Sequence, residues 1–174
     1  MLQTEKNKKD NDVIKKLKEV QFFKMYSHDD SVIRKITDLC TRKKFRKGAA
    51  IIREGDYGDE LFIFLNGKGE IVKETLQNEQ YTITTFDSDI GGVCVGEFAL
   101  IDNDRRSATI IAKTECECLV IKREKFMQFG NKNPEIGLNI TRAIARELSI
   151  MLRKTNTDII TLFSALVEEI AGNE

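Results

Sequence analysis

The chain has 174 residues, enough for one domain with helical extensions and a core that needs no disulfide bond or metal. Lys and Arg together number 28, as do Asp and Glu, so the formal net charge is zero and the long-range field that attracts proteins to nucleic acid is missing. No stretch approaches the ~18 apolar residues of a membrane span, and residues 1–12 are too polar for a signal peptide. We therefore expect a cytoplasmic protein that binds neither nucleic acid nor a membrane.

Four cysteines and one histidine offer little chemistry. Cys116 and Cys118 share one face of any strand, because neighbours two apart point the same way, and Cys40 and Cys94 stand apart from them. These residues are too scattered for a zinc site, so we expect reduced core thiols. The sequence also lacks the Gly-x-Ser-x-Gly and phosphate-loop motifs of common enzymes. We predict no catalytic residue, no metal and no cofactor.

At the N-terminus, a polar tail precedes a helical lead-in. Residues 1–12 are charged and are expected to be mobile, whereas residues 13–41 are expected to form helices. The first helix is amphipathic, with Val13, Leu17 and Val20 on one side.

The second helix of the lead-in is predicted to begin with Ser27 as its N-cap, followed by acids in the first turn. His28, the single histidine, is expected to be exposed there. The inward side is formed by Val32, Ile33, Ile36 and Leu39.

From residue 42 to 122, short apolar runs alternate with turn residues, which indicates about seven or eight short strands. The run at 61–65 is followed by Asn66-Gly67, which predicts a two-residue hairpin to the next strand. Residues 54–59, Glu-Gly-Asp-Tyr-Gly-Asp, predict a turn built on two glycines. Together these features predict a small antiparallel roll or barrel.

The period returns to 3.6 residues in the C-terminal part. A short helix is predicted at 123–130, and Pro134 stands where a second, long helix can begin. Its apolar stripe comprises Ile140, Ile144, Leu148, Met151 and Leu152, and then Ile159, Leu162, Phe163, Leu166, Val167 and Ile170. The stripe exceeds what one small roll can cover, so two interpretations stay open: packing on the chain's own roll, or pairing with a second copy.

Residues 96–110 carry the chemistry. Gly96 permits a close backbone approach after a strand, and residues 97–101 can form one helical turn whose free N–H groups favour an anion. A polar loop then leads to Arg106 at the start of a strand, where its planar fork can reach the same anion. A carboxylate, a helix start and a guanidinium thus suit a phosphate with a nearby sugar hydroxyl.

This stretch resembles the phosphate-binding cassette of the cyclic nucleotide-binding domain family, which includes catabolite activator proteins, regulatory subunits of cyclic-AMP-dependent kinase and gated ion channels. The residues that match its pattern are Gly96, Glu97, Phe98, Ala99, Leu100, Arg106, Ser107, Ala108 and Thr109. The likeness covers about residues 13–153 and implies a stand-alone member without a DNA-binding module. It implies an α+β fold, with an antiparallel β-roll of the jelly-roll (double-stranded β-helix) type at 42–122 and the cassette at 96–109. N-terminal helices at 13–41 and C-terminal helices at 123–174 flank the roll, the latter as a lid and a possible dimer contact.

The resemblance also implies roles for single residues. Glu97 accepts a hydrogen bond from the ribose 2′-hydroxyl of cAMP or cGMP, and Arg106 pairs with the cyclic phosphate. Ser107 and the backbone amides of Phe98, Ala99, Ser107 and Ala108 complete the phosphate cradle beside Gly96. The expected apolar walls for ribose and base are Val72, Ile83, Val93, Cys94 and Val95, and Arg146 in the long helix is a candidate lid contact.

Some features of the cassette leave alternatives open. Glu97 and Arg106 are also suited to pair with each other and close a loop. Phe98 is expected to plug the core beneath the cassette, and Arg105, where the family often has proline, is expected to be solvated. The approach at 86–95 is longer than the family's usual connection, and its two adjacent glycines would permit a bulge.

Two functions follow as hypotheses. The first is a sensor that couples capture of cAMP or cGMP to movement of its C-terminal helix, with an unknown downstream protein. The second is a family member that has lost its ligand and acts as a protein–protein interaction module. A transcription regulator is disfavoured for the chain as given, because no helix-turn-helix or basic patch follows the long helix.

Overall fold

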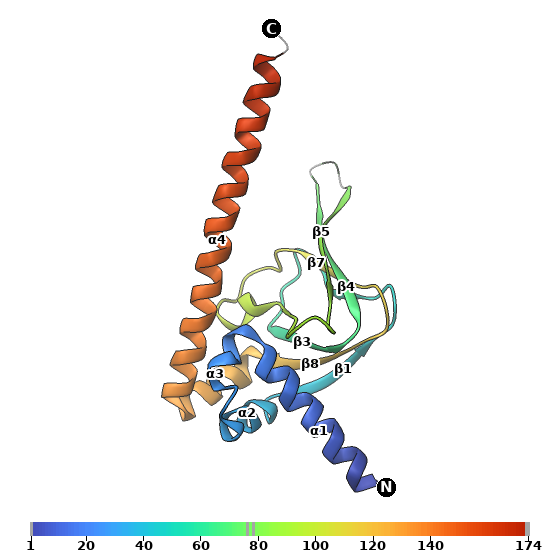
Figure 1. The fold of residues 1–174 in the computed structure, drawn as a ribbon, viewed down its shortest axis with the longest axis vertical. Helices are drawn as coiled ribbons and strands as arrows, with labels where there is room; N and C mark the ends of the chain where they lie inside the picture. The colour runs from blue at the N-terminus through green and yellow to red at the C-terminus, as the bar shows by residue number, and fades with distance from the viewer. Residues whose placement is uncertain (1, 76, 78, 173–174) are drawn as a thin grey trace.

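The computed structural model describes residues 2–75, 77 and 79–172. The N-terminal helices and the base of the long C-terminal helix gather on one side of a β-roll, as Figure 1 shows, so the fold is α+β as predicted. The helices are α1 (Leu2–Glu19), η1 (Gln21–Tyr26), α2 (Asp30–Thr37), η2 (Glu97–Leu100), α3 (Arg123–Lys132) and α4 (Pro134–Ala171), of which η1 and η2 are 3₁₀ helices. The strands are β1 (Thr41–Phe45), β2 (Ala50–Ile52), β3 (Glu60–Asn66), β4 (Lys68–Glu74), β5 (Gln80–Asp87), β6 (Cys94–Val95), β7 (Thr109–Ala112) and β8 (Cys116–Lys122).

The roll consists of two antiparallel four-stranded sheets, ordered β1-β8-β3-β6 and β2-β7-β4-β5. The predicted hairpin at Asn66-Gly67 is wrong, because β3 and β4 lie in different sheets and do not pair. The turn instead carries the chain from one sheet to the other. Gly67 has φ 106°, and a Cβ there would be 2.5 Å from Cys116 Sγ, so the turn requires glycine. The Asn66 side chain accepts a hydrogen bond from the Glu117 amide at 3.1 Å.

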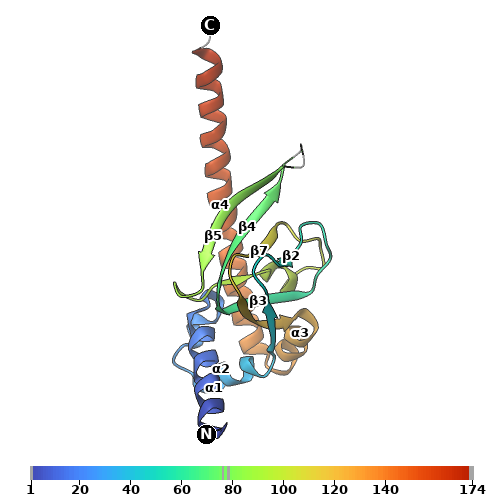
Figure 2. The same ribbon diagram turned by 90° about the vertical axis from the view of Figure 1, so that its right-hand side faces the viewer.

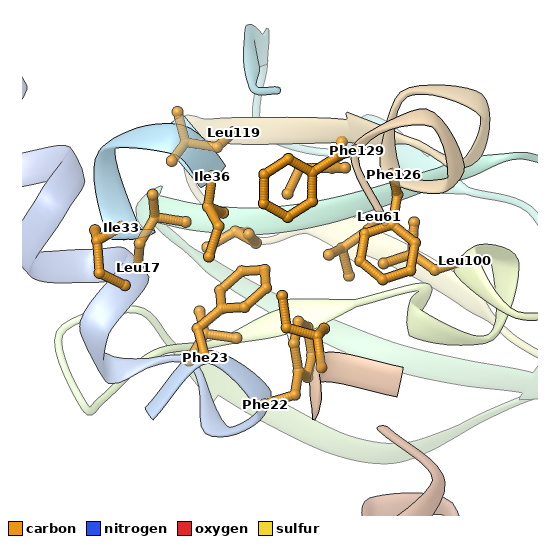
Figure 3. Packing of buried hydrophobic residues seen from close by; sticks show 14 of the residues in the cluster. Leu17, Phe22, Phe23, Ile33, Ile36, Leu61, Leu100, Leu119, Phe126 and Phe129 are labelled. Atoms are coloured by element: carbon orange, nitrogen blue, oxygen red, sulfur yellow. The ribbon is translucent and has the colours of Figure 1, made fainter. Parts of the chain in front are cut away.

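Alternation along the strands builds two hydrophobic cores. In β3, Phe62 and Phe64 point into the roll, while Leu61 and Ile63 point toward the helices. The core inside the roll includes Cys116 and Cys118, which share a face as predicted and are free thiols. The core on the helical side joins residues from both ends of the chain, and Figure 3 shows Phe22, Phe23 and Ile36 meeting Leu119, Phe126 and Phe129. The helices are therefore packed as part of the domain.

The N-terminal helices differ from the prediction at two points. Helix α1 begins at Leu2, so most of the segment predicted as a mobile tail is helical, while the inward face of Val13, Leu17 and Val20 is buried as expected. The N-cap of α2 is Asp29, whose carboxylate accepts from the Ser31 and Val32 amides at 3.0 and 3.1 Å. Ser27 instead ends η1, where its amide donates to the Lys24 carbonyl. His28 is exposed, as predicted.

Helix α4 has two different halves. Pro134 begins the helix, as predicted, and Gly137 lies against Gly130 of α3, where a Cβ would be 2.6 Å from the Gly130 Cα. Ile140 and Ile144 are fully buried on this side of the domain. From residue 149 to 172 every residue is exposed, and Figures 1 and 2 show this half rising alone beyond the roll. None of the described helices combines the length and hydropathy needed to cross a membrane.

Candidate functional site

The backbone of Arg106 is fixed by the turn at 54–59. The Gly55 amide donates to the Arg106 carbonyl at 2.9 Å, and the Arg106 amide donates to the Asp56 carbonyl at 2.9 Å. The neighbouring Arg105 donates from Nη1 to the Gly55 carbonyl at 2.7 Å, and its guanidinium lies 4.8 Å from the centre of the Tyr57 ring. We expected Arg105 to be solvated. It is exposed, but its guanidinium also stacks on this turn.

The guanidinium of Arg106 is held between two glycines. Its Nη2 donates to the Glu60 carbonyl at 2.7 Å and its Nη1 to the Gly96 carbonyl at 3.4 Å. A Cβ on Gly58 would be 2.6 Å from Nε, and a Cβ on Gly96 would be 2.6 Å from Nη1. A guanidinium has five N–H donors, so three remain for another acceptor. The two glycines therefore create the space in which this cation is placed.

Glu97 begins the helical turn of the cassette. Gly96 precedes it with φ 83°, a backbone conformation that favours glycine, and η2 follows immediately. Burial raises the pKa of the Glu97 carboxyl above its ordinary value, although its own backbone amide and the charge of Arg106 act in the opposite direction. The carboxyl is thus poorly solvated and gains from a hydrogen-bond donor.

Glu97 and Arg106 form no ion pair with each other in the part of the chain that the structure describes. Burial lowers the pKa of the Arg106 guanidinium, while the carboxylates of Glu60 and Asp59, and then those of Glu97 and Asp102, oppose that shift. The alternative in which the two residues pair and close the loop is therefore wrong for this arrangement. Arg106 stays a cation whose desolvation is only partly offset.

The amides of the cassette are not equivalent. The Ala99 amide donates to the Gly96 carbonyl at 3.1 Å, so it is already engaged within η2. The amides of Ser107 and Ala108 have no hydrogen-bond partner among the described residues. Thr109 then ties the end of the cassette to the glycine turn, because its Oγ1 accepts from the Glu54 amide at 2.9 Å. The unpaired amides thus follow Arg106 directly in sequence.

The core plug beneath the cassette is Leu100, and the expectation for Phe98 is wrong. Leu100 is 1% exposed and belongs to the core on the helical side, next to Phe126 in Figure 3. Phe98 is half-buried and belongs to neither core. A short 3₁₀ turn places the third residue after Glu97, not the first, against the domain.

The residues predicted as apolar walls lie on different faces. Val93 and Val95 pack with the core inside the roll, whereas Cys94 packs with the core on the helical side. Val72 is buried and lies opposite Thr109 across the β4–β7 pair, beside the cassette. Ile83 is on β5 and is 51% exposed. The structure therefore brings Val72 close to the cassette backbone, and it turns Cys94 away from the interior of the roll.

Helix α4 carries Glu147, whose charge acts on the cassette. Its charge adds to the raised pKa of Glu97, which places the two carboxyls within electrostatic reach of each other. Arg146, the predicted lid contact, is exposed on the same helix. Sequence reasoning missed Glu147, Gly58 and the carbonyl of Glu60. For Gly58 the sequence signal is the two-glycine turn at 54–59, although nothing local in the sequence links that turn to Arg106.

Two surface hollows differ in their relation to the cassette, and only the first includes a cassette residue, Asn103. One, of about 260 Å³, is lined by Asp59, Asn103, Arg123, Glu124 and Met127. The other, of about 380 Å³, lies at the β1–β8 edge and includes Phe45, Asn66 and Cys116 in its lining. Neither contains Arg106 or Glu97, so the candidate site is defined by its polar groups.

Comparisons with known proteins match the roll and the cassette segment to a described family. A family model described as the cyclic nucleotide-binding domain matches residues 42–133, just over half of the chain. cGMP-dependent protein kinase 2 of Homo sapiens is 42% identical over 96 residues, which are 54% of this chain and 12% of the kinase. The cyclic AMP receptor protein of Thermus thermophilus is 27% identical over 107 residues, which are 62% of this chain and 48% of that protein. The chain thus spans less than half the length of either relative.

A solved structure extends the likeness beyond the roll. The N-terminal domain of a transcriptional regulator from Streptomyces coelicolor A3(2) has a TM-score of 0.68 and 25% identity, covering 83% of this chain and 94% of that one. This coverage exceeds the stretch matched by the family model, so the flanking helices also contribute to it. The family match contains the whole cassette at 96–109. The chain belongs to the cyclic nucleotide-binding domain family.

Proposed function

We propose that this chain is a regulatory domain that binds cAMP or cGMP at residues 96–109 and that it has no catalytic role of its own. The observation that carries the proposal is the fixed guanidinium of Arg106, which keeps three N–H donors and forms no ion pair with a described carboxylate. The adjacent amides of Ser107 and Ala108 add two donors without partners among the described residues. A cyclic phosphate is an anion with several acceptor oxygens, and it fits this set of donors.

The sugar is assigned to Glu97. A ribose hydroxyl that donates to the buried carboxylate stabilises its charged form and offsets the burial that raises its pKa. The names of the relatives include both cyclic AMP and cGMP, so the base is left to the experiment.

Thermal unfolding with a panel of cyclic nucleotides tests the assignment. A ligand that binds only the folded state stabilises it by about 2.7 kcal/mol at one hundred times its Kd. We expect cAMP or cGMP to raise the Tm in proportion to the logarithm of its concentration, while the matching linear 5′-monophosphate has a smaller effect. No shift with either cyclic nucleotide at millimolar concentration would instead support the interaction module that has lost its ligand.

We also propose that ligand capture is coupled to α4. The charge of Glu147 already acts on Glu97, so a ligand that binds this carboxyl changes the electrostatic environment of the helix. Coupling follows if the ligand favours one position of α4 over another. Amide hydrogen exchange along residues 140–150, with and without ligand, measures this effect directly.

A second proposal concerns the exposed half of α4, which we propose pairs with α4 of a second copy. Apolar residues recur there at spacings of seven, four, three and four, at Leu152, Ile159, Phe163, Leu166 and Ile170, and each is between 53% and 66% exposed. A lone helix with so much exposed apolar surface gains stability by pairing.

Asn156 favours two parallel, in-register helices. It occupies the position between Leu152 and Ile159 in the same heptad stripe. In a parallel pair the two Asn156 side chains face each other and can hydrogen-bond, a known device for fixing register and a two-stranded state. An antiparallel pair centred on this segment would place Asn156 opposite an apolar residue and leave its amide without a partner.

A further inference from the structure

The approach to the cassette, longer than the family pattern, contacts helix α1. Residues 88–93, here called the strap, connect β5 to β6 and lead within four residues to Glu97. Ser88 is fully buried, and its amide donates to the Gly67 carbonyl at 3.1 Å. The strap is therefore an anchored segment of the domain.

Lys16 of α1 holds the strap. Its Nζ donates to the Ser88 carbonyl at 2.5 Å and approaches the Gly91 carbonyl at 3.5 Å. The same ammonium pairs with Glu19, one turn further along α1, at 3.2 Å. Its side chain is 17% exposed, so these bonds are partly shielded from water.

Gly92 brings the strap into backbone contact with the end of α1. Val20 and Gly92 form a parallel β-bridge. A Cβ on Gly92 would be 2.3 Å from the Glu19 carbonyl carbon and 2.4 Å from the Val20 nitrogen. Only glycine fits at this contact, and Val20 itself is fully buried in the helical core.

The other end of the strap is continuous with the ligand site. The Val93 carbonyl accepts from the Phe64 amide at 2.9 Å, and Cys94 and Val95 then pair with β3. The next residue, Gly96, offers the carbonyl to which Arg106 donates. A displacement of the strap would therefore shift Gly96 and Glu97, and through the Gly96 carbonyl it would also affect the Arg106 guanidinium.

We propose that Lys16 is a positioning residue for the cyclic nucleotide site, and that the strap couples the docking of α1 to ligand affinity. This inference rests on the proposed function. Docked α1 holds the strap in the arrangement that places Gly96 and Glu97 beside Arg106, and a bound ligand in turn stabilises docked α1. The coupling is reciprocal, so a partner or chain segment that pulls α1 away weakens ligand binding.

The test uses the full chain and three variants: Lys16→Met, which keeps the stem but removes the donor, Lys16→Arg, which restores a cationic donor, and Lys15→Met as the exposed control one residue away. The Kd for cAMP and cGMP is measured by calorimetry. Amide exchange of residues 13–19 is recorded with and without the tighter ligand. Coupling of ordinary size predicts at least about fivefold weaker binding for Lys16→Met. Lys16→Arg should recover most of the affinity, and Lys15→Met should match the wild type.

Ligand-dependent protection distinguishes positioning from a merely structural role. We expect the ligand to slow exchange in α1 of the wild type and to lose this effect in Lys16→Met, at ligand concentrations that saturate both proteins. The inference is overturned if folded Lys16→Met has an unchanged Kd, or if a bound ligand leaves amide exchange in wild-type α1 unchanged. Either result leaves the proposed function standing. Failure of the wild type to bind either nucleotide overturns the proposed function and the inference with it.

Discussion

The Nη1 atom of Arg106 lies so close to Gly96 that a Cβ on that glycine would be 2.6 Å away. Gly58 bounds the same guanidinium from the other side, where a Cβ would again be 2.6 Å away, in this case from Nε. Two segments distant in sequence thus shape one cation site. At Gly58 the nearest atoms all belong to the Arg106 side chain, so an added methyl group there moves the guanidinium and leaves the backbone in place, whereas a Cβ on Gly96, which has φ 83°, would also be 3.0 Å from the Glu60 carbonyl oxygen.

Gly58→Ala is expected to weaken cyclic nucleotide binding by about tenfold or more, since the displaced guanidinium loses a charge-assisted bond. The Tm should change little, because no left-handed backbone conformation is required at position 58. Gly130→Ala is the control: a Cβ there meets only the Gly137 Cα, at an ordinary 3.7 Å, and does not face the Arg106 guanidinium. Calorimetric titration of both variants gives the answer, and equal affinity of Gly58→Ala and wild type would contradict the site geometry.

The raised pKa of Glu97 predicts opposite pH trends for stability and binding. A carboxyl whose folded pKa exceeds its unfolded value near 4.5 adds stability that is fully present below the unfolded pKa and is lost as pH rises through the folded pKa. Binding should strengthen over the same window, because the ribose hydroxyl donates to the ionised form.

Glu97→Gln isolates this group from other carboxylates that titrate nearby. The difference in unfolding free energy and in Kd between wild type and Glu97→Gln is measured from pH 4 to about pH 7. Both differences should depend on pH. If the Kd of the wild type equals that of Glu97→Gln at every pH, the Glu97 carboxylate does not take part in ligand binding.

Phe163→Glu is expected to dissociate the proposed α4 pair, because it buries two like charges at the centre of the stripe. Thr161→Glu adds the same charge on the polar side of the helix and should leave the dimer intact. Sedimentation equilibrium distinguishes a mass of about twice 19.9 kDa from the monomer. A monomeric wild type at tens of micromolar would contradict the proposal.

Alternation and periodicity made much of the fold predictable. The apolar run at 61–65 supplies both cores because Phe62 and Phe64 face one way and Leu61 and Ile63 the other. The Gly-Glu and Arg-Ser-Ala-Thr ends of the cassette are local in sequence, so they point to Glu97 and Arg106 without any knowledge of the fold.

Features that depend on distant segments were not predictable in this way. Asn66-Gly67 has the composition of a hairpin turn, but Asn66 pairs with Glu117 near the start of β8, and the passage of the chain to the other sheet is not encoded in two residues. Likewise, Leu100 rather than Phe98 fills the core, because η2 is a tight 3₁₀ turn that presents that residue inward. The contact of Lys16 with the strap joins residues 72 positions apart, and no local pattern indicates it.

The N-cap of α2 provides a stability test. Asp29→Ala should lower the free energy of unfolding by about 1 kcal/mol, because the Ser31 and Val32 amides lose their acceptor. Ser27→Ala, at the position favoured by sequence alone, should cost much less. Urea unfolding of both variants measures the difference, and a larger loss for Ser27→Ala would reverse the assignment of the cap.

Calorimetric titration of Arg106→Ala against Arg105→Ala tests the central claim most directly. The two arginines are neighbours, yet only Arg106 places its guanidinium between Gly58 and Gly96. Loss of a charge-assisted bond of about 1.5–3 kcal/mol predicts roughly ten- to hundredfold weaker binding for Arg106→Ala. Arg105→Ala should stay within about threefold of the wild type. Arg106→Ala binding as tightly as the wild type, in a protein that remains folded, would contradict the account.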